Sequence, residues 1–207
     1  MPLRVPTGGI LPNAGGRAET YGLLKTQKIV QNKGMEVNFC RRCAAPLTKL
    51  SESSYKCSNG HNVFYDASPA ASSIIVTHDG KIALTVRAFN PHKGKNSLFG
   101  GYVDYGESFE QALTRELKEE VGLTPDDYET PVYLTSAPDD YEWEGNATRV
   151  LSNMYLVRLK SHAVLKPADD VADVIYMTPE TVPYDTVAFP SNVVGIKAAI
   201  ELLGEGK

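Results

Sequence analysis

The chain has 207 residues, of which 42% are hydrophobic and 22% charged, and this composition supports one globular domain with a small additional unit. Its formal net charge of −4 argues against nucleic acid or an anionic membrane surface as a partner, whereas a small phosphorylated ligand needs only local Lys and Arg. No apolar run approaches the roughly 18 residues of a membrane span. The N-terminal residues also lack the apolar core of a signal peptide, so we expect a cytoplasmic protein with no membrane partner.

Residues 1–35 are expected to form an N-terminal extension. Residues 1–17 are rich in Pro and Gly without apolar periodicity, which predicts a flexible leader, and residues 18–33 are compatible with a short helix. Met35 directly precedes the first well-patterned segment. Translation could therefore begin at Met35, in which case residues 1–34 would not belong to the native protein.

Residues 36–68 contain four candidate metal ligands in the spacing C-x2-C-x13-C-x3-H, namely Cys40, Cys43, Cys57 and His61. Three thiols and an imidazole suit tetrahedral Zn²⁺ with no open coordination position. The chain has three cysteines, an odd number, which argues against a disulfide framework. We predict a structural zinc ribbon; the alternative is a group of reduced cysteines beside a surface histidine.

Two β-rich runs follow between residues 71 and 87, joined through Asp79-Gly80, which is a strong hairpin signal. The next loop carries Lys93 and Lys95, which we expect to be solvated loop charges. His78 and His92 are expected to be ordinary surface histidines, and they receive no functional role.

The best-defined predicted helix begins after Ser108. Ser108 and Gln111 form a capping box, and Gly122 stands where a C-terminal cap belongs. Four apolar residues recur at a spacing of four and predict one buried helix face; they are Phe109, Leu113, Leu117 and Val121. The helix is therefore expected to pack on the core along this face.

Three glutamates, Glu116, Glu119 and Glu120, overlap the edge of this apolar face. Carboxylates so close together repel one another, and partial burial adds a desolvation cost. A hard cation such as Mg²⁺ or Mn²⁺ removes both penalties, because it takes oxygen ligands and shares them with water and phosphate. The pattern therefore predicts a catalytic divalent metal at this edge of the helix.

After the helix, residues 131–137 and 150–159 are predicted strands, and the acidic and aromatic segment between them, residues 138–149, is expected to be a loop. A further short strand is predicted at residues 174–178. Residues 189–207 carry the apolar spacing of a helix that packs on a sheet.

The segment from Gly101 to Leu123 matches, position for position, the Nudix box G-x5-E-x7-R-E-U-x-E-E-x-G-U, where U is a bulky aliphatic residue. The matching residues are Gly101, Glu107, Arg115, Glu116, Leu117, Glu119, Glu120, Gly122 and Leu123. The chain thus resembles the Nudix hydrolase family, in the branch that carries a zinc ribbon, over residues 36 to about 203. The resemblance implies an α/β fold, an α/β/α sandwich with a mixed β-sheet at residues 69–207, preceded by the ribbon at residues 36–68.

The same resemblance implies hydrolysis of a nucleoside diphosphate linked to another moiety, by water attacking phosphorus with the help of Mg²⁺ or Mn²⁺. Glu116 and Glu120 are then metal ligands, and Glu119 is a further ligand or the general base. The carbonyl group of Gly101 is an additional candidate ligand, since glycine lets the backbone approach an ion closely.

Arg115 and Glu107 are expected to form a buried pair that holds the preceding loop against the helix, because Arg offers a rigid fork to a carboxylate. The chain reads Phe99-Gly100-Gly101-Tyr102 where many relatives have Pro-Gly-Gly-Phe. In some family members the base comes from a later loop, and six acidic residues remain candidates for that role or are solvated surface acids: Asp139, Asp140, Glu142, Glu144, Asp169 and Asp170.

Three residues are candidates for substrate binding. Arg87 occupies the place of an arginine that often contacts substrate phosphate in the family, with a surface ion pair as the alternative. Tyr141 and Trp143 could stack on an adenine or a ribose, or pack against the sheet.

The substrate is predicted from two further resemblances. A ribbon ahead of the catalytic domain resembles NADH pyrophosphatases, but their signature S-Q-P-W-P-F-P-x-S survives only as Ser136-Ala137-Pro138. Pro138 lies about 15 residues beyond the box, where ADP-ribose pyrophosphatases carry a proline. We therefore predict cleavage of ADP-ribose to AMP and ribose 5-phosphate.

Several alternatives remain open at this stage. One is an NAD(H) pyrophosphatase or another nucleotide housecleaning hydrolase, and another is a non-catalytic module for nucleotide sensing or RNA binding. Such modules often lose box carboxylates, and this chain keeps them all. RNA cap removal would require a basic groove, which the acidic composition does not indicate. Several Nudix enzymes are dimers, so a homodimer is compatible with the resemblance.

Overall fold

The computed structural model describes residues 38–51, 53–64, 67–143 and 146–205. These residues form two separate β-sheets, one of three strands and one of seven. The predicted flexible leader and short helix in residues 1–35 lie outside the described residues.

The three-stranded sheet has the order β1-β2-β3 with antiparallel neighbours. Its strands are β1 (Leu47–Lys49), β2 (Ser54–Cys57) and β3 (Asn62–Phe64). The buried residues of this unit are few, and two of them, Cys40 and Cys57, are cysteines. So small a core contributes little hydrophobic stabilisation by itself.

The seven-stranded sheet has the order β10-β5-β4-β9-β8, with β6 beside β5 and β7 beside β4. Strands β4 and β9 run parallel, whereas the other pairs are antiparallel, so the sheet is mixed. Its strands are β4 (Ser68–Val76), β5 (Ile82–Arg87), β6 (Asn96–Ser97), β7 (Phe99–Tyr102), β8 (Val132–Trp143), β9 (Asn146–Arg158) and β10 (Val171–Met177).

Strand β4 is the centre of this sheet, because it pairs with β9 along its whole length and with two strands on its other edge. Residues 70–73 pair with β7, and residues 75–76 pair with β5. The turn predicted at Asp79-Gly80 joins β4 to β5, and Gly80 takes a positive φ of 82° there. The predicted hairpin is therefore confirmed, and it is completed by β7 on the same edge.

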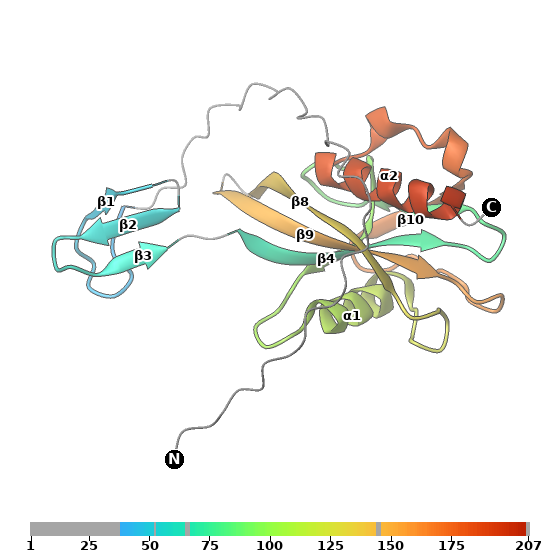
Figure 1. Cartoon of the computed structure of the whole chain (residues 1–207), viewed down its shortest axis with the longest axis horizontal. Helices are drawn as coiled ribbons and strands as arrows, with labels where there is room; N and C mark the ends of the chain where they lie inside the picture. The colour runs from blue at the N-terminus through green and yellow to red at the C-terminus, as the bar shows by residue number, and fades with distance from the viewer. Residues whose placement is uncertain (1–37, 52, 65–66, 144–145, 206–207) are drawn as a thin grey trace, which may run out of the picture. The chain divides into compact units, whose positions relative to one another are not determined.

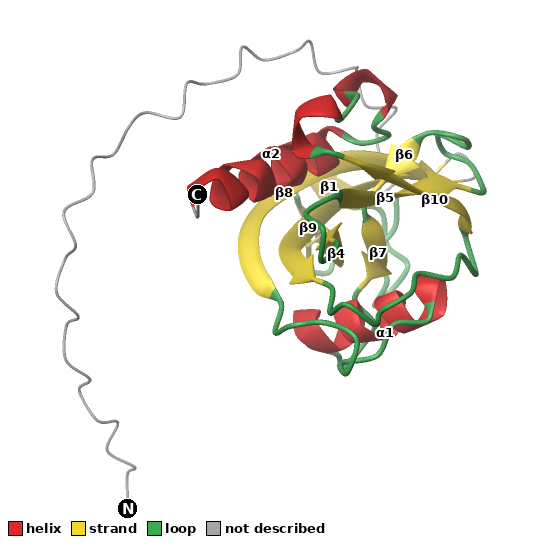
Figure 2. Cartoon of the chain, turned by 90° about the vertical axis from the view of Figure 1, so that its right-hand side faces the viewer, coloured by secondary structure: helices red, strands yellow, loops and turns green. Residues whose placement is uncertain are grey.

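Helices α1 (Phe109–Val121) and α2 (Pro190–Glu205) cover opposite faces of the sheet, as Figures 1 and 2 show. Alternate residues of β4 point to opposite faces. Thus Ile75 packs in the core with Leu113 and Leu117 of α1, whereas Ile74 packs with Ile196 of α2. The predicted α/β/α sandwich with a mixed sheet is confirmed.

The loop predicted at residues 138–149 is wrong, because β8 and β9 extend through this segment as a long antiparallel pair. The exposed Asp140 and Glu142 alternate with Asp139 and Tyr141, which line a cavity on the other face, and this is a strand pattern. Asp140 lies opposite Arg149, whose Nε donates to Asp140 Oδ1 at 3.2 Å. A cross-strand pair of opposite charge stabilises the strands here.

Within the described part of the chain, no helix is both long and apolar enough to cross a membrane.

The close packing of β7 on β4 generates a test of stability. Gly100 has a φ of 128°, and a Cβ atom there would collide with the Ala71 carbonyl oxygen and lie 2.8 Å from Ser72 Cα. Backbone atoms of a central strand cannot move aside. We expect Gly100→Ala to reduce the free energy of unfolding by more than about 4 kcal/mol, a loss that only severe changes cause.

Gly80→Ala is the matched control for this experiment. Gly80 has a positive φ of 82°, and a Cβ atom added to it would meet no atom of the surrounding structure within 4 Å. The cost of this substitution should be limited to about 1–2 kcal/mol of backbone strain. Denaturant unfolding of both variants checks the prediction, and equal losses would contradict it.

Candidate active site and metal centres

Helix α1 is fixed at both ends by the caps predicted from the sequence. The backbone N–H of Ser108 donates to Gln111 Oε1 at 2.8 Å, and the N–H of Gln111 donates back to Ser108 Oγ at 3.3 Å. At the other end Gly122 adopts the left-handed conformation with φ 72° and its N–H donates to the last carbonyl groups. The rotation of the helix about its axis is then set by its apolar face, with Leu117 and Val121 fully buried.

This rotation presses Glu116 and Glu120 against the Gly100-Gly101 backbone of β7. A Cβ atom at Gly101 would lie 2.5 Å from Glu116 Oε1, so any other residue here would displace the Glu116 carboxylate. The N–H of Gly100 donates to Glu120 Oε2 at 2.8 Å. Three of the candidate metal ligands of the sequence, Glu116, Glu120 and the Gly101 backbone, are therefore brought together.

Burial gives these carboxylates unusual acidities. Glu120 has only 4% of its surface exposed, and burial, together with the negative charge of Asp170, raises its pKa well above the usual range. Burial also raises the pKa of Glu116, although the guanidinium of Arg115 opposes the shift. Both glutamates would therefore be stabilised by a nearby cation.

Among the five later acidic candidates that the structure describes, Asp170 alone raises the pKa values of both Glu116 and Glu120. It lies in the loop before β10, and its carbonyl oxygen accepts a hydrogen bond of 2.9 Å from the N–H of Ala88. The pairing of β10 with β5 thus carries Asp170 to the carboxylates of α1. Sequence spacing contains no signal for this approach, because it depends on the sheet order.

The donor set fits a hard divalent cation. Glu116 and Glu120 supply carboxylate oxygens beside the Gly100-Gly101 backbone, and the charge of Asp170 acts on both. Neither Glu120 nor Asp170 forms an ion pair with any described residue. A group of acids with so little compensating charge is the arrangement that Mg²⁺ or Mn²⁺ would complete.

Arg115 ties the loop before α1 to the helix, as predicted. Its Nε and one terminal nitrogen donate to the two oxygens of Glu107 at 2.9 and 3.0 Å. This bidentate pair lowers the pKa of Glu107. The guanidinium also donates to Glu116 at 2.7 Å, to the Tyr102 carbonyl at 2.9 Å and to the exposed Glu119 at 3.1 Å.

The prediction that the Arg115 and Glu107 pair is buried is wrong, since their side chains remain 26% and 22% exposed. The reason is that the pair lies at the mouth of the site, where the guanidinium must also reach the exposed Glu119. The described geometry leaves Glu119 at the rim, and Glu120 is the buried member of the three glutamates.

A cavity of about 180 Å³ lies beside the carboxylates, between the sheet and the start of α2. Gly100, Gly101 and Asp170 line one part of it, and Arg87 and Tyr141 line another. Two of the three predicted substrate-binding residues therefore face one cavity. The third, Trp143, belongs to β8, but its side chain lies outside the described side chains.

Phe189 is a cavity residue that the sequence reasoning missed. Its ring centre lies 5.1 Å from the guanidinium carbon of Arg87 and 5.8 Å from the ring centre of Tyr141. Arg87 is held by its own hydrogen bond, because its Nε donates to the Pro91 carbonyl at 2.8 Å. The available signal was the aromatic residue at the start of the last predicted helical segment.

Ser191 and Asn192 also line the cavity and were missed. Both are almost completely buried, at 1% and 5% exposure. The N–H of Ser191 donates to Asp139 Oδ1 at 3.2 Å, and burial raises the pKa of Asp139. Polar residues in the first turn of an otherwise apolar helix were the signal for this part of the site.

The remaining acidic candidates for the general base that the structure describes do not line the cavity beside the carboxylates of α1. Asp140 is exposed and paired with Arg149, while Glu142 and Asp169 are exposed. Glu144 lies outside the described residues. Lys93, Lys95, His78 and His92 are exposed, as expected, although the His92 ring contacts Phe189 edge to face at 5.2 Å.

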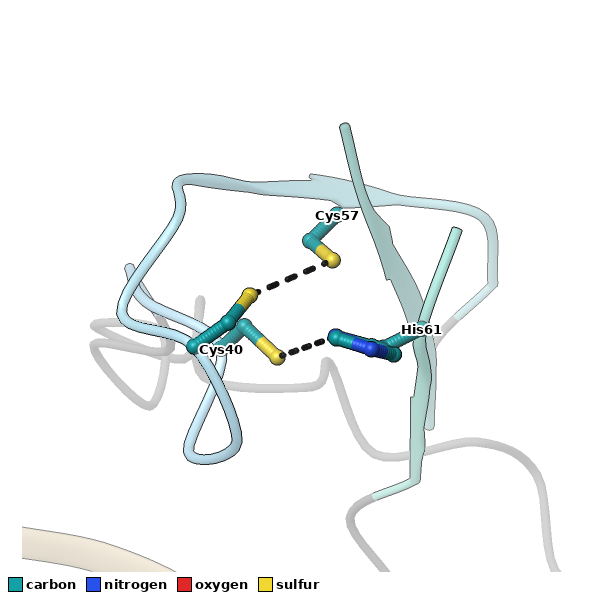
Figure 3. A group of neighbouring side chains, drawn as sticks. Cys40, Cys57 and His61 are labelled. Carbon is teal, nitrogen blue, oxygen red and sulfur yellow. Dashed lines mark hydrogen bonds between the residues drawn. The ribbon is translucent and has the colours of Figure 1, made fainter. Parts of the chain in front are cut away.

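The four predicted zinc ligands converge in the three-stranded unit, with all ligand atoms within 4.8 Å of one another. Figure 3 shows the side chains of Cys40, Cys57 and His61 pointing toward a common point. Cys40 Sγ lies 3.7 Å from His61 Nδ1, and Cys43 Sγ lies 3.8 Å from Cys57 Sγ. A tetrahedron with Zn–S bonds of about 2.3 Å has edges of about 3.8 Å, so the spacing fits zinc.

One thiol of this group, that of Cys43, also loses its proton more readily than an ordinary thiol. The backbone N–H of Ala45, together with the side chain of Asn59, lowers the pKa of the Cys43 thiol to about 6. The thiolate is the form that binds a metal ion. The chemistry of the donors therefore agrees with their geometry.

Comparison with known proteins gives one family over most of the seven-stranded unit. The model of the NUDIX domain matches residues 67–194. An ADP-ribose pyrophosphatase of Methanocaldococcus jannaschii is 51% identical over 51 residues, which are 25% of this chain and 30% of that protein. The mitochondrial NAD(P)H pyrophosphatase NUDT13 of Homo sapiens is 35% identical over 106 residues, 51% of this chain and 30% of that protein. The matches span less than one third of these two relatives.

The fold has close structural counterparts. A NUDIX hydrolase from Nitrosomonas europaea, known from its crystal structure, has a TM-score of 0.61 and 20% sequence identity. The alignment covers 82% of this chain and 94% of that one. At this identity the likeness concerns the fold.

The burial of Glu120 predicts an unusual stability effect in metal-free protein. Because its folded-state pKa is raised, ionisation destabilises the fold as the pH rises above the unfolded-state pKa of about 4.3. Glu120→Gln removes this charge but keeps an oxygen for the Gly100 N–H. We expect the variant to melt higher than the parent at pH 7.5 by about 2–4 °C for each kcal/mol relieved.

Thermal melts at pH 5 and pH 7.5 with a chelated buffer check this expectation, and the advantage of the variant should shrink at pH 5. Adding Mg²⁺ should then stabilise the parent more than the variant. Glu201→Gln on the exposed side of α2 is the control and should change neither melt. A lower melting temperature for metal-free Glu120→Gln at pH 7.5 would contradict the assignment.

The thiol and imidazole cluster predicts one zinc ion per chain. Elemental analysis of purified protein should find one equivalent of Zn²⁺, and Cys57→Ser should abolish it. Removal by a strong chelator should lower thermal stability, since metal binding supplies folding free energy to so small a unit. An unchanged melting curve in a sample shown to have lost its zinc would count against a structural role.

Proposed function

Because the chain belongs to the NUDIX family, we propose that it is a Mg²⁺-dependent pyrophosphohydrolase that cleaves a nucleoside diphosphate linked to another moiety. The observation that carries this proposal is the packing of Glu116 and Glu120 against the Gly100-Gly101 backbone, close enough to Asp170 for its charge to raise both pKa values. The cavity next to these carboxylates gives the rest of a nucleotide a place to bind.

Glu116 and Glu120 hold the catalytic cation, with Asp170 and the Gly101 carbonyl as additional ligands. When bound, Mg²⁺ or Mn²⁺ neutralises charge on the pyrophosphate and acidifies bound water. Glu120 is oriented by the Gly100 N–H, and Glu116 by Arg115. These fixed hydrogen bonds hold the carboxylate oxygens in one arrangement before substrate arrives.

Glu119 is the member of the box best placed to accept a proton from water. Its side chain is exposed at the rim, where the Arg115 guanidinium holds it by a hydrogen bond of 3.1 Å. Arg115 and Glu107 act through other residues, since their bidentate pair positions Glu116 and Glu119. Loss of this pair would misplace the reacting groups without removing one of them.

ADP-ribose is the proposed substrate, with AMP and ribose 5-phosphate as products. Tyr141 offers a ring for stacking, and Arg87 offers a positive charge for phosphate or a ribose oxygen at the same cavity. The similarity to an ADP-ribose pyrophosphatase of M. jannaschii, 51% over 51 residues, supports this choice. Pro138, retained in β8, is the sequence feature that agrees with it.

NAD(H) is the second candidate substrate. The observation that favours it is the match to the NAD(P)H pyrophosphatase NUDT13, which extends over 106 residues. A zinc ribbon at residues 36–68, ahead of a hydrolase domain at residues 69–207, is the layout that the sequence shares with NADH pyrophosphatases. In this arrangement zinc is structural, and it takes no part in hydrolysis.

The deciding experiment measures product release from ADP-ribose, NADH, a dinucleoside polyphosphate and ATP in parallel, with and without Mg²⁺. AMP should appear from ADP-ribose only when Mg²⁺ is present. Glu120→Gln should reduce turnover at least about 100-fold, because it removes a metal ligand. Glu201→Gln serves as the matched control and should retain the parent rate.

The outcomes separate the candidates. AMP from NADH at a higher kcat/KM than from ADP-ribose would select the second substrate. Near-parental turnover of Glu120→Gln would overturn the metal assignment. No turnover of any of the four compounds would favour a nucleotide-sensing role over catalysis.

A further inference from the structure

Two polar side chains that line the 180 Å³ cavity have no part in the proposed hydrolysis. They are Asp139, from the β8 strand, and Asn192, from the first turn of α2. Asn192 is 5% exposed, and burial affects Asp139 strongly enough to raise its pKa. Polar groups held at the wall of an aromatic cavity are the means by which a site orients a ligand.

The orientation of the Asn192 amide is fixed by its neighbours. Its Oδ1 accepts hydrogen bonds from the Leu98 N–H at 3.2 Å and from Ser97 Oγ at 2.9 Å. Because a backbone N–H can only donate, the oxygen must face Leu98 and the NH₂ group must face the other way. The contact of Nδ2 with Ser191 Oγ is long, at 3.5 Å, and uses one of its two hydrogens. The second N–H of this amide has no hydrogen-bond partner among the residues that the structure describes, so it can donate to a ligand.

Asp139 supplies the complementary group. An ionised carboxylate only accepts hydrogen bonds and has about four acceptor positions. Among the described residues its hydrogen-bonding partner is Ser191, through the backbone N–H at 3.2 Å and the hydroxyl group. Acceptor capacity therefore remains, next to the donor of Asn192, because Ser191 contacts both side chains.

The aromatic side chains of the cavity suit a flat ring. Tyr141 and Phe189 lie 5.8 Å apart with an interplanar angle of 34°, and Tyr102 meets Tyr141 edge to face. The volume of 180 Å³ is small beside the roughly 300–1,000 Å³ of sites for drug-sized ligands. The cavity thus accepts one ring-sized group, while the phosphates of a nucleotide extend toward Gly101 and the carboxylates.

An acceptor beside a donor matches a base in which an amino group lies next to an unprotonated ring nitrogen. Adenine and cytosine have this edge. Hypoxanthine and uracil have a carbonyl group in place of the amino group and a protonated ring nitrogen, so they would direct a carbonyl oxygen at the Asp139 carboxylate. Such a contact rejects the ligand, since two acceptors face each other with no proton between them.

We propose that Asp139 determines base specificity, so that this cavity selects amino-bearing bases, adenine or cytosine, over their oxo counterparts, with Asn192 donating to the adjacent ring nitrogen. The inference rests on the proposed function in one respect, namely that a nucleotide is the ligand. It adds the class of base and the residue that reads it.

Equilibrium binding to the full zinc-loaded chain tests the inference without any need for turnover. Titration calorimetry with AMP, IMP, CMP and UMP in the presence of Mg²⁺ compares two pairs that differ in the amino group. AMP should bind at least about fivefold more tightly than IMP, the lower end of what one base contact discriminates, or CMP should do so over UMP. The pair with the larger difference identifies adenine or cytosine.

Asp139→Asn is the matched variant, because the amide keeps an oxygen for the Ser191 N–H but can also donate to a carbonyl group. It should remove the preference or reverse it. Asp126→Asn, an exposed acid outside the cavity, makes the same charge change and should leave the preference intact. Equal binding of both members of each pair by the parent protein, or no binding of any of the four, would overturn the proposal even if Asp139→Asn failed to fold.

Hydrolysis separates this inference from the proposed function. Suppose that ADP-ribose is hydrolysed, and that the kcat/KM for ADP-ribose divided by the kcat/KM for its inosine analogue is the same in the parent and in Asp139→Asn. The base assignment then fails and the function stands. If no substrate is hydrolysed but the AMP preference disappears in Asp139→Asn, the function fails and the base assignment stands.

Discussion

The close approach of two glycines of β7 to the carboxylates of α1 is the constraint on which the site depends. Gly100 must pass the backbone of β4 with a positive φ, and Gly101 must leave room for Glu116. Strand β7 lies close to β4 because Gly100 has no side chain, and Glu116 of α1 lies close to β7 because Gly101 has none. The Gly100 N–H donates a hydrogen bond to Glu120. A buried carboxylate is tolerable there only with such a donor and a compensating charge.

The parts of the molecule that could be predicted from the sequence are those that depend on residues close together in the chain. The caps of α1 depend on residues within one turn of each end, and the ligand set of the zinc ribbon depends on spacing, so both follow from local chemistry. The two faces of β4 also follow, because alternation assigns Ile74 and Ile75 to different helices. The Nudix box could be read for the same reason, since its members lie on one loop and one helix.

The sequence could not show which of the later residues reach the site, because these residues are joined only by the fold. Asp170 reaches Glu120 because β10 pairs with β5. Phe189, the residue directly before α2, lies against Arg87 of β5. The wrong loop at residues 138–149 has a related cause. Acidic residues there are stable in strands because Arg149 stands opposite Asp140, and a single sequence does not disclose that register.

The start of α2 has a consequence for the energetics of ligand binding. The segment before the helix is tied to the sheet by a 2.8 Å hydrogen bond from the Ala188 N–H to the Asn96 carbonyl, and by a 2.7 Å bond from the Asn96 amide to Thr186 Oγ1. Phe189, Ser191 and Asn192 therefore occupy their positions before a ligand arrives. A receptor wall that is already immobile loses little conformational entropy on association, so more of the contact energy remains as affinity. The conformational entropy of these residues is lost when the chain folds, and it is not lost again each time a ligand binds.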